Sequence, residues 1–470
     1  MGRTRASKGL FITAILGIIL AMVSVPASAA ESRSTSKRDT RLSLPQAVSI
    51  ALARNLRMSD ARLDVQEKEY QRREAYSDFF PTVDMQYIAT GNRYQQQGNI
   101  QAFAGAQDSR WATVRGPVNA AGLFPTYPYR IDPYRTFTMA ATITQPLYTG
   151  GRLLSDYRFA RLGVDYSAIQ MDVERQDLTL DVYEAYYQLV QGIKLLGVAE
   201  SSIRALEALR NQTIEFYKAG VVPKVDVLST EGQLAQARIQ KTQALSDIGK
   251  SRATLNFLLR YPQETPTDVI QDTAYKPNNY SIPNIYSVAA ANRLEIRQAN
   301  ISVEQAMALV KSAKADLLPS VSVQGEASRT NDDWNPFDHE AINNWQIQGI
   351  LSWTFDMFRR RETVQERRAS QARAFVAREQ LVEQVMEEVK LAYLDMKRSE
   401  SDIENNRKAV EFRSENFRIN QERYKEQVAT YIEVLDAQRQ LSVAEGDLIT
   451  SLMGYRINQA NLERRMGIIR

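Results

Sequence analysis

The 470-residue chain contains no cysteine and only one histidine, His339. The lack of cysteine excludes disulfide bonds, cysteine nucleophiles and thiolate metal sites. One histidine cannot build a three-histidine zinc site, so we expect His339 to be a surface loop residue. Gly150 and Gly151 are not followed by Gly-Lys-Ser/Thr, which a phosphate-binding loop requires. The sequence therefore predicts no enzyme and no cofactor.

Long apolar runs are also missing beyond residue 30, so no later stretch is suited to a membrane-spanning helix. The one apolar run, Leu10 to Val23, follows three basic residues and precedes an Ala27-Ser28-Ala29 cleavage pattern. This order predicts a signal peptide over residues 1–30. An uncleaved anchor helix is the alternative, although it would need roughly twenty apolar residues. Cleavage would lower the formal charge from +4 to about +1, which gives no sign of a nucleic-acid surface.

Two stretches of the chain align without a gap at an offset of 207 residues, Tyr217 to Leu228 and Tyr424 to Leu435. Each lies between two long helical patterns, and Gly220 and Pro223 break the helix in the first copy. We interpret both stretches as the sharp turns of long helical hairpins. Earlier segments match at an offset of 238, which indicates two copies of one long unit.

The predicted organisation is a first repeat at 31–260, a linker at 261–283 and a second repeat at 284–470. In the first repeat we expect a helix at 44–79, strands at 82–90 and 136–147, and a helical hairpin at 151–259 with its tip at 218–224. In the second we expect a helix at 284–318, strands at 320–328 and 344–355, and a hairpin at 359–466 with its tip at 425–431.

The predicted strands alternate apolar residues with threonine, serine, glutamine and aspartate. Strands of about ten residues are long enough to cross a bilayer when tilted. A half-buried sheet of a soluble protein gives the same alternation, but the signal peptide and the lack of spanning helices favour the membrane. Four strands cannot close a barrel, so the chain must combine strands with copies of itself.

The long hairpins cannot be hidden in a globular domain. A continuous helix from Gly151 to Lys218 would be roughly 100 Å long at ~1.5 Å per residue. Such a helix must project and be paired along its length, and the returning helices supply the partners. A cytoskeletal rod would fit these helices but would leave the strands and the signal peptide unexplained.

Several motifs together resemble the TolC-type outer-membrane efflux and secretion duct family. They are the Pro146–Arg152 turn, the strand starts at Pro81 and Pro319, the duplication, the two tips and the stretch Glu433–Gln438. The resemblance implies a mixed α and β membrane protein. Its homotrimer would combine a transmembrane β-barrel of twelve strands, four from each chain, with a long α-helical coiled-coil barrel.

The resemblance also implies a location and partners. The barrel would lie among outer-membrane lipids and the helices would reach through the periplasm, where a periplasmic adaptor protein and an inner-membrane transporter would dock. The expected function is the passive exit duct of a tripartite efflux pump for small toxic compounds. The duct of a type I protein secretion system is the alternative, and a surface adhesin is a third hypothesis.

The resemblance assigns roles to residues at the tips. It implies an acidic constriction ring of Glu433 and Asp436, in which crowding of like charges should raise some pKa values. It also implies a lock between Tyr424 and Asp226. The expected adaptor contacts are Gly220, Val221, Val222, Gln427 and Val428. An arginine of the family's second tip is replaced here by Ala429, which puts an arginine-based lock in doubt.

Overall fold

The computed structural model describes residues 41–92, 134–272, 274–331, 334–335 and 341–469. Residues 1–41 and 42–470 form separate units, and all elements named below belong to the second. The expected signal peptide and His339 lie outside the described residues. None of the helices in the described ranges combines the length and the apolar character that crossing a membrane requires.

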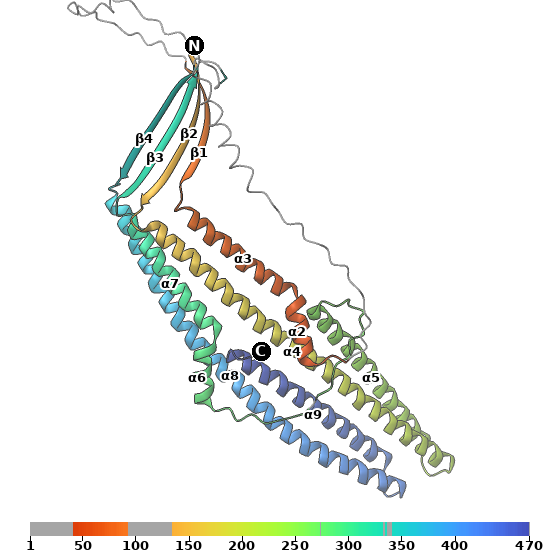
Figure 1. The fold of residues 1–470 in the computed structure, drawn as a ribbon. Helices are drawn as coiled ribbons and strands as arrows, with labels where there is room; N and C mark the ends of the chain where they lie inside the picture. Colours follow the sequence, from red (N-terminus) through yellow and green to blue (C-terminus); the bar gives the residue numbers. More distant parts are fainter. Residues whose placement is uncertain (1–40, 93–133, 273, 332–333, 336–340, 470) are drawn as a thin grey trace, which may run out of the picture. The chain divides into compact units, whose positions relative to one another are not determined.

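The elements follow one order twice along the chain: two helices, two strands, one very long helix and a returning helix (Figure 1). The first set is α2 (Leu44–Arg54), α3 (Leu56–Ser77), β1 (Thr82–Asn92), β2 (Tyr134–Tyr148), α4 (Arg152–Lys218) and α5 (Lys224–Leu259). The second is α6 (Ile282–Asn292), α7 (Leu294–Ala315), β3 (Ser320–Asn331), β4 (Ile342–Ser352), α8 (Met357–Lys425) and α9 (Tyr431–Arg465). The strand ends differ from the predicted ones by up to three residues.

The single helices predicted over 44–79 and 284–318 are both wrong, because each is divided by one extended residue. Asn55 (φ −65°, ψ 140°) separates α2 from α3, and Arg293 (φ −63°, ψ 117°) separates α6 from α7. The Asn55 side chain accepts a hydrogen bond from the backbone N–H of Arg57 at 2.9 Å and donates one to the carbonyl of Leu258 at 2.9 Å. Asn55 therefore caps α3 and ties the break to the end of α5.

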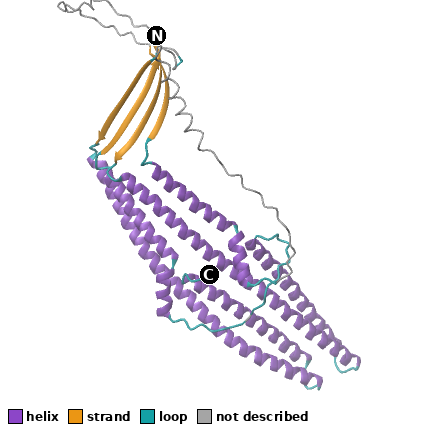
Figure 2. Ribbon diagram, in the orientation of Figure 1, coloured by secondary structure: helices purple, strands orange, loops and turns teal. Residues whose placement is uncertain are grey.

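The four strands form one antiparallel sheet in the order β1-β2-β3-β4. Figure 2 shows this sheet beyond one end of the long helices, so no described helix covers either of its faces. The register gives the two faces different chemistry. One face is mainly apolar and includes Val83, Met85, Ile143, Ile347 and Leu351. The other carries mostly hydroxyl and amide side chains, including the Thr138 and Thr330 hydroxyls 3.1 Å apart and the hydrogen-bonded pair Gln348 and Gln324 at 2.9 Å.

The chain passes from β2 into α4 through Gly150, which has φ +65°. A Cβ atom at this position would lie 2.5 Å from the carbonyl oxygen of Ala315, at the end of α7. Glycine is therefore required both by the left-handed backbone and by the close approach of α7. This turn sets the start of α4 against the second half of the chain.

Helix α4 is the central element of the helical part and packs against α2, α3, α5, α7 and α9. One buried core joins α2, α4 and α5 around Leu178, Leu189 and Leu255. A second joins α6, α8 and α9 around Ile285, Met396 and Leu462.

Two buried arginines connect four of these helices. Arg464 on α9 donates to Asp177 on α4 at 2.6 Å and to Glu295 on α7 at 2.8 Å. Arg293 donates to Glu388 on α8 at 2.9 Å. Removing one member of a buried charge pair typically costs about 3–5 kcal/mol, because the remaining charge is left unpaired. This network therefore holds the helices in one arrangement.

Candidate functional site

The two helical hairpins end in tips with the same backbone turn. In the first, the N–H of Val221 donates to the carbonyl of Phe216 at 2.9 Å and the N–H of Gly220 to that of Tyr217 at 3.0 Å. In the second, the N–H of Val428 donates to the carbonyl of Arg423 at 2.8 Å. These bonds satisfy carbonyl groups at the helix ends.

Each turn needs one residue in the left-handed conformation. Gly220 fills this position with φ +74°, and Gln427 fills it in the second tip with φ +60°. For a residue with a Cβ atom, the left-handed conformation costs roughly 1–2 kcal/mol. The second tip is therefore strained where the first is not.

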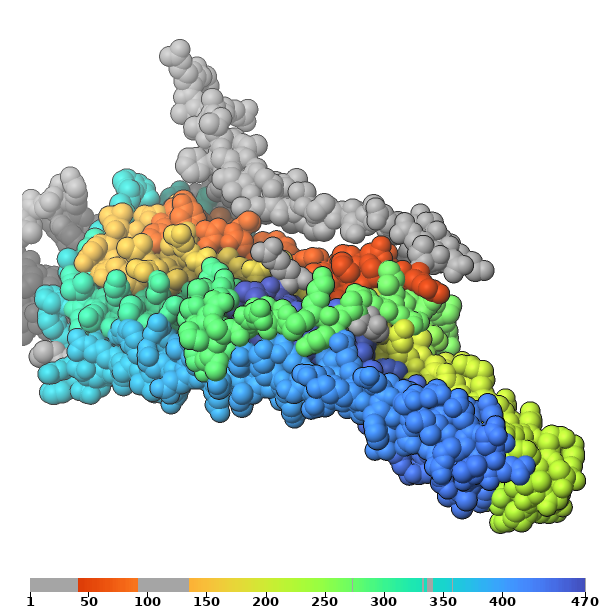
Figure 3. Space-filling model, turned by 90° about the horizontal axis from the view of Figure 1, so that it is seen from below, coloured from red at the N-terminus to blue at the C-terminus, as the bar shows by residue number. Residues whose placement is uncertain are grey.

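The tips expose apolar side chains at the end of the molecule's helical part. Figure 3 shows the α8–α9 tip in blue beside the α4–α5 tip in yellow-green. Val428 is 67% exposed and Val221 48% exposed. Gly220 and Gln427 are also exposed, whereas Val222 is half-buried. Four of the five residues expected to contact an adaptor are therefore accessible at the tips.

Glu433 helps to begin α9. Its N–H donates to the hydroxyl of Thr430 at 3.4 Å, and its carboxylate accepts from the backbone N–H of Thr430 at 3.3 Å. This reciprocal pair is a capping box. The Arg423 guanidinium lies 3.8 Å from the same carboxylate. Glu433 thus has a local structural role in addition to the role expected from the resemblance.

Asp436 lies one turn further along α9 and is exposed. It accepts a hydrogen bond from Arg439 at 2.7 Å and another from Gln440. The bond from Arg439 lowers the pKa of Asp436 below its usual value. Within one chain, the paired arginine therefore acts opposite to the rise in pKa expected from crowding of acidic groups.

Tyr424 and Asp226 are both buried, but the Tyr424 hydroxyl bonds to a different residue. Tyr424 packs against Leu209 and Val434 and lies 3.2 Å from the hydroxyl of Thr213 on α4. Because the Thr213 hydroxyl donates to the carbonyl of Leu209 at 2.9 Å, Tyr424 is the donor in the Tyr424–Thr213 bond.

Burial and charge affect both members of the expected lock. Burial raises the pKa of the Tyr424 phenol, and the nearby Asp226 carboxylate raises it further. Burial also raises the pKa of Asp226. The structure therefore places these residues within electrostatic reach of each other while the hydrogen bond goes to Thr213.

Sequence reasoning missed the polar residues that join the two hairpins. Besides Thr213, Gln438 on α9 donates to the Ser202 hydroxyl on α4 at 2.7 Å, and both residues are buried. The detectable signal was a polar residue on an otherwise apolar helix face. The partner could not be detected, because Gln438 and Ser202 lie 236 residues apart in the chain.

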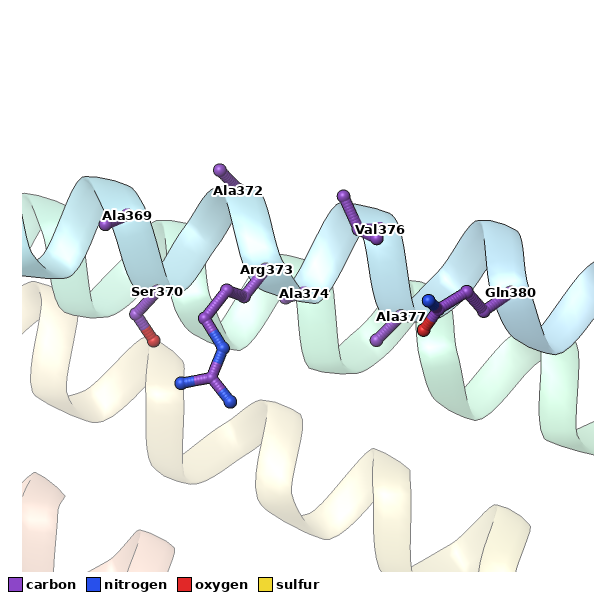
Figure 4. A pocket seen from close by; sticks show the side chains of 8 residues that line it. All are labelled: Ala369, Ser370, Ala372, Arg373, Ala374, Val376, Ala377 and Gln380. Atoms are coloured by element: carbon purple, nitrogen blue, oxygen red, sulfur yellow. The ribbon is translucent and has the colours of Figure 1, made fainter.

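Among the described residues, no group of three or more histidine, aspartate or glutamate side chains is arranged so that it could hold a metal ion. A groove of about 720 Å³ runs along α8 and is lined mainly by small residues, with one arginine (Figure 4). Its lining residues are Ala369, Ser370, Ala372, Arg373, Ala374, Val376, Ala377 and Gln380. Because one helix supplies them all, the groove is an open helix face and not an enclosed pocket.

The family model described as "Outer membrane efflux protein" matches residues 47–259 and 285–467. Nodulation protein T of Rhizobium leguminosarum bv. viciae is 22% identical over 62% of this chain and 61% of its own length. Outer membrane protein TolC of Escherichia coli K12 is 20% identical over 64% of this chain and 63% of its own length. These alignments span less than two thirds of either relative.

Solved structures match over more of the chain. The outer-membrane channel OprN superposes with a TM-score of 0.73 at 20% identity, covering 90% of this chain and 89% of its own. The CmeC outer membrane channel of Campylobacter jejuni has the same TM-score at 15% identity, covering 95% and 93%. At these identities the likeness shows the fold alone, a mostly helical chain with a four-stranded antiparallel sheet.

Replacing Gln427 by glycine should stabilise the second tip by about 1 kcal/mol, because glycine adopts the left-handed conformation without strain. The matched change Gly220→Gln should destabilise the first tip by a similar amount. Chemical unfolding of both variants measures the two effects. A Gln427→Gly variant no more stable than the wild type would show that the turn is not strained.

Asp226→Asn should stabilise the protein at neutral pH. The raised pKa means that Asp226 contributes most to stability below the ordinary aspartate pKa of about 3.9 and loses this contribution as pH rises through its folded value. Unfolding of the variant and the wild type should be measured from pH 3 to pH 8. The variant should be the more stable protein at the upper end of this range, and its advantage should disappear near ~pH 3–4.

Asp436→Asn is the matched control with the opposite sign. Its lowered pKa means that the carboxylate stabilises the fold above the ordinary aspartate pKa and loses this effect as pH falls. The variant should therefore be less stable than the wild type at neutral pH. Identical pH profiles for the two variants would contradict at least one of the two assignments.

Proposed function

This chain belongs to the outer membrane efflux protein family, and from that premise we propose that it is the outer-membrane exit duct of a tripartite efflux pump. In this proposal it passively conducts small toxic compounds outward from an inner-membrane transporter and its periplasmic adaptor. The observation that carries the proposal is the sheet. It has one mainly apolar and one mainly polar face, and no described helix covers either face.

Such a sheet is suited to a wall between lipid and water. The apolar face can contact acyl chains, and the hydroxyl and amide face can line an aqueous lumen. The strands of 11 to 15 residues are long enough for a tilted crossing.

Self-association into a homotrimer completes the wall. β1 and β4 are the outer strands of the sheet, and their unpaired backbone groups cannot remain in lipid. Pairing β1 of one copy with β4 of the next would satisfy these groups, and three copies would give a barrel of twelve strands. The small side chains along α8 support close packing against a neighbouring helix in the coiled-coil barrel below.

The two sets of elements and the shared tip turn support an internal duplication of the chain. In the trimer, each copy would contribute Glu433 and Asp436 to a constriction ring that favours cations. Tyr424 and Asp226 would help to lock the hairpins through their shared buried environment. The exposed tip residues, including Val221 and Val428, would receive the adaptor.

Cells that lack this gene should accumulate a fluorescent efflux dye and should recover on expression of the wild-type chain. The double variant Val221→Asp plus Val428→Asp should fold but fail to restore efflux, because charge at both tips opposes an apolar contact with the adaptor. Dye retention in whole cells measures the effect.

The control is a second charge change away from the tips, Glu264→Ala, which should restore efflux fully. Normal dye export in the deletion strain combined with a loss of secreted proteins would instead indicate a type I secretion duct. A protein that is monomeric and soluble without detergent would contradict both ducts.

The double variant Glu433→Ala plus Asp436→Ala should increase the single-channel conductance in planar bilayers and weaken block by a trivalent cation. The reason is that six carboxylates per trimer would be removed from one constriction. Glu264→Ala again serves as the control. Unchanged conductance and block would place the constriction elsewhere in the duct.

A further inference from the structure

The four strands contain only four charged side chains within their described residues, and these are separated by sign. Asp84 lies on β1 and Glu326 on β3, both on the hydroxyl and amide face. Arg135 on β2 and Arg329 on β3 both lie on the apolar face, towards the ends of the strands that are farther from the helices. The polar face of the described sheet therefore carries two negative charges and no positive charge.

The register also places the two acidic residues at one level. Asp84 pairs with Thr142 on β2, and Thr142 pairs with Glu326 on β3. Glu326 pairs in turn with Gln346 on β4. Directly opposite residues in antiparallel strands point to the same face, so these four side chains form one cross-strand row. With neighbouring strands ~4.8 Å apart, the backbones of the two acidic residues are about 10 Å apart.

The neighbours of the row on the polar face bring no positive charge to either carboxylate. Gln346 donates a hydrogen bond to the Glu326 carboxylate at 2.8 Å, which orients the group without neutralising it. Asp84 is exposed. The rows on either side offer threonine, serine and glutamine, which can solvate a passing ion but cannot compensate a negative charge.

We propose that the row of Asp84 and Glu326 is a charge filter within the sheet, favouring the passage of cations independently of the acidic residues at the tips. The proposal rests on the proposed function, because only a closed wall turns this face into a lumen. In a trimer the row would become one ring of six carboxylates. The filter acts on ions in transit and requires no bound metal.

The test is the reversal potential of single channels under a KCl gradient, from which the potassium-to-chloride permeability ratio follows. To remove the tip ring, all measurements are made in the Glu433→Ala plus Asp436→Ala background. A unit charge about 9 Å from an ion in water changes its local concentration by about twofold. Because each variant removes three carboxylates per trimer, Asp84→Asn and Glu326→Gln should each lower the ratio by at least about twofold, and the double variant should lower it further.

Two further variants separate the filter from general effects of charge. Arg135→Gln changes the charge of the sheet on the opposite face and should leave the ratio unchanged. Thr142→Lys inserts a positive charge between the two intact carboxylates and should lower the ratio. Lower salt should enlarge the effects of Asp84→Asn and Glu326→Gln, because the Debye length of about 10 Å at 0.1 M ionic strength increases.

The outcomes distinguish this inference from the function on which it rests. Channels that conduct normally but keep their permeability ratio in both the carboxylate variants and Thr142→Lys would overturn the filter and leave the duct intact. If the folded wild-type protein forms no channel, the duct and the filter both fail. Trimer assembly in detergent confirms that each variant has folded before its current is measured.

Discussion

The two outer strands impose the constraint on which the proposed assembly depends. Each presents a row of backbone N–H and C=O groups that no other described strand pairs, beside an apolar face that no described helix covers. In water such edges promote uncontrolled association, and in lipid each unpaired group costs several kcal/mol. In the proposed trimer, a closed ring of strands would remove both problems. Gly150 lets the start of α4 approach the end of α7 closely, directly beside the sheet. The helices of the three copies would therefore be arranged around the same symmetry axis as the strands.

Local patterns predicted much of the architecture, and tertiary contacts decided what they could not predict. Alternation indicated the strands, and Gly220 with Pro223 indicated a turn between helices. The breaks at Asn55 and Arg293 carry no proline or glycine signal. Asn55 is extended because its side chain reaches Leu258, some 200 residues later. Arg293 is extended where its guanidinium enters a buried ionic network.

The same distinction applies to the tips. The repeated stretch predicted two similar turns, but glutamine, unlike glycine, gives no signal of the left-handed conformation that Gln427 shares with Gly220. The Asp436–Arg439 pair lies within one helical turn and could have been found by spacing. The partner of Tyr424 could not, because Thr213 becomes its neighbour only when α4 packs beside the second hairpin. Residue types at a site were thus predictable, whereas their bonding partners were not.

The buried arginines have a consequence for the order in which the protein matures. Arg464 stands near the end of the last helix, and its carboxylate partner Asp177 precedes it by 287 residues. Asp177 and Glu295 therefore lack their Arg464 partner until α9 has been synthesised. Contacts of such separation make folding slow and leave intermediates with exposed apolar surface. This part of the helical region consequently closes only after α9 has emerged, which makes a chaperone most useful in that interval.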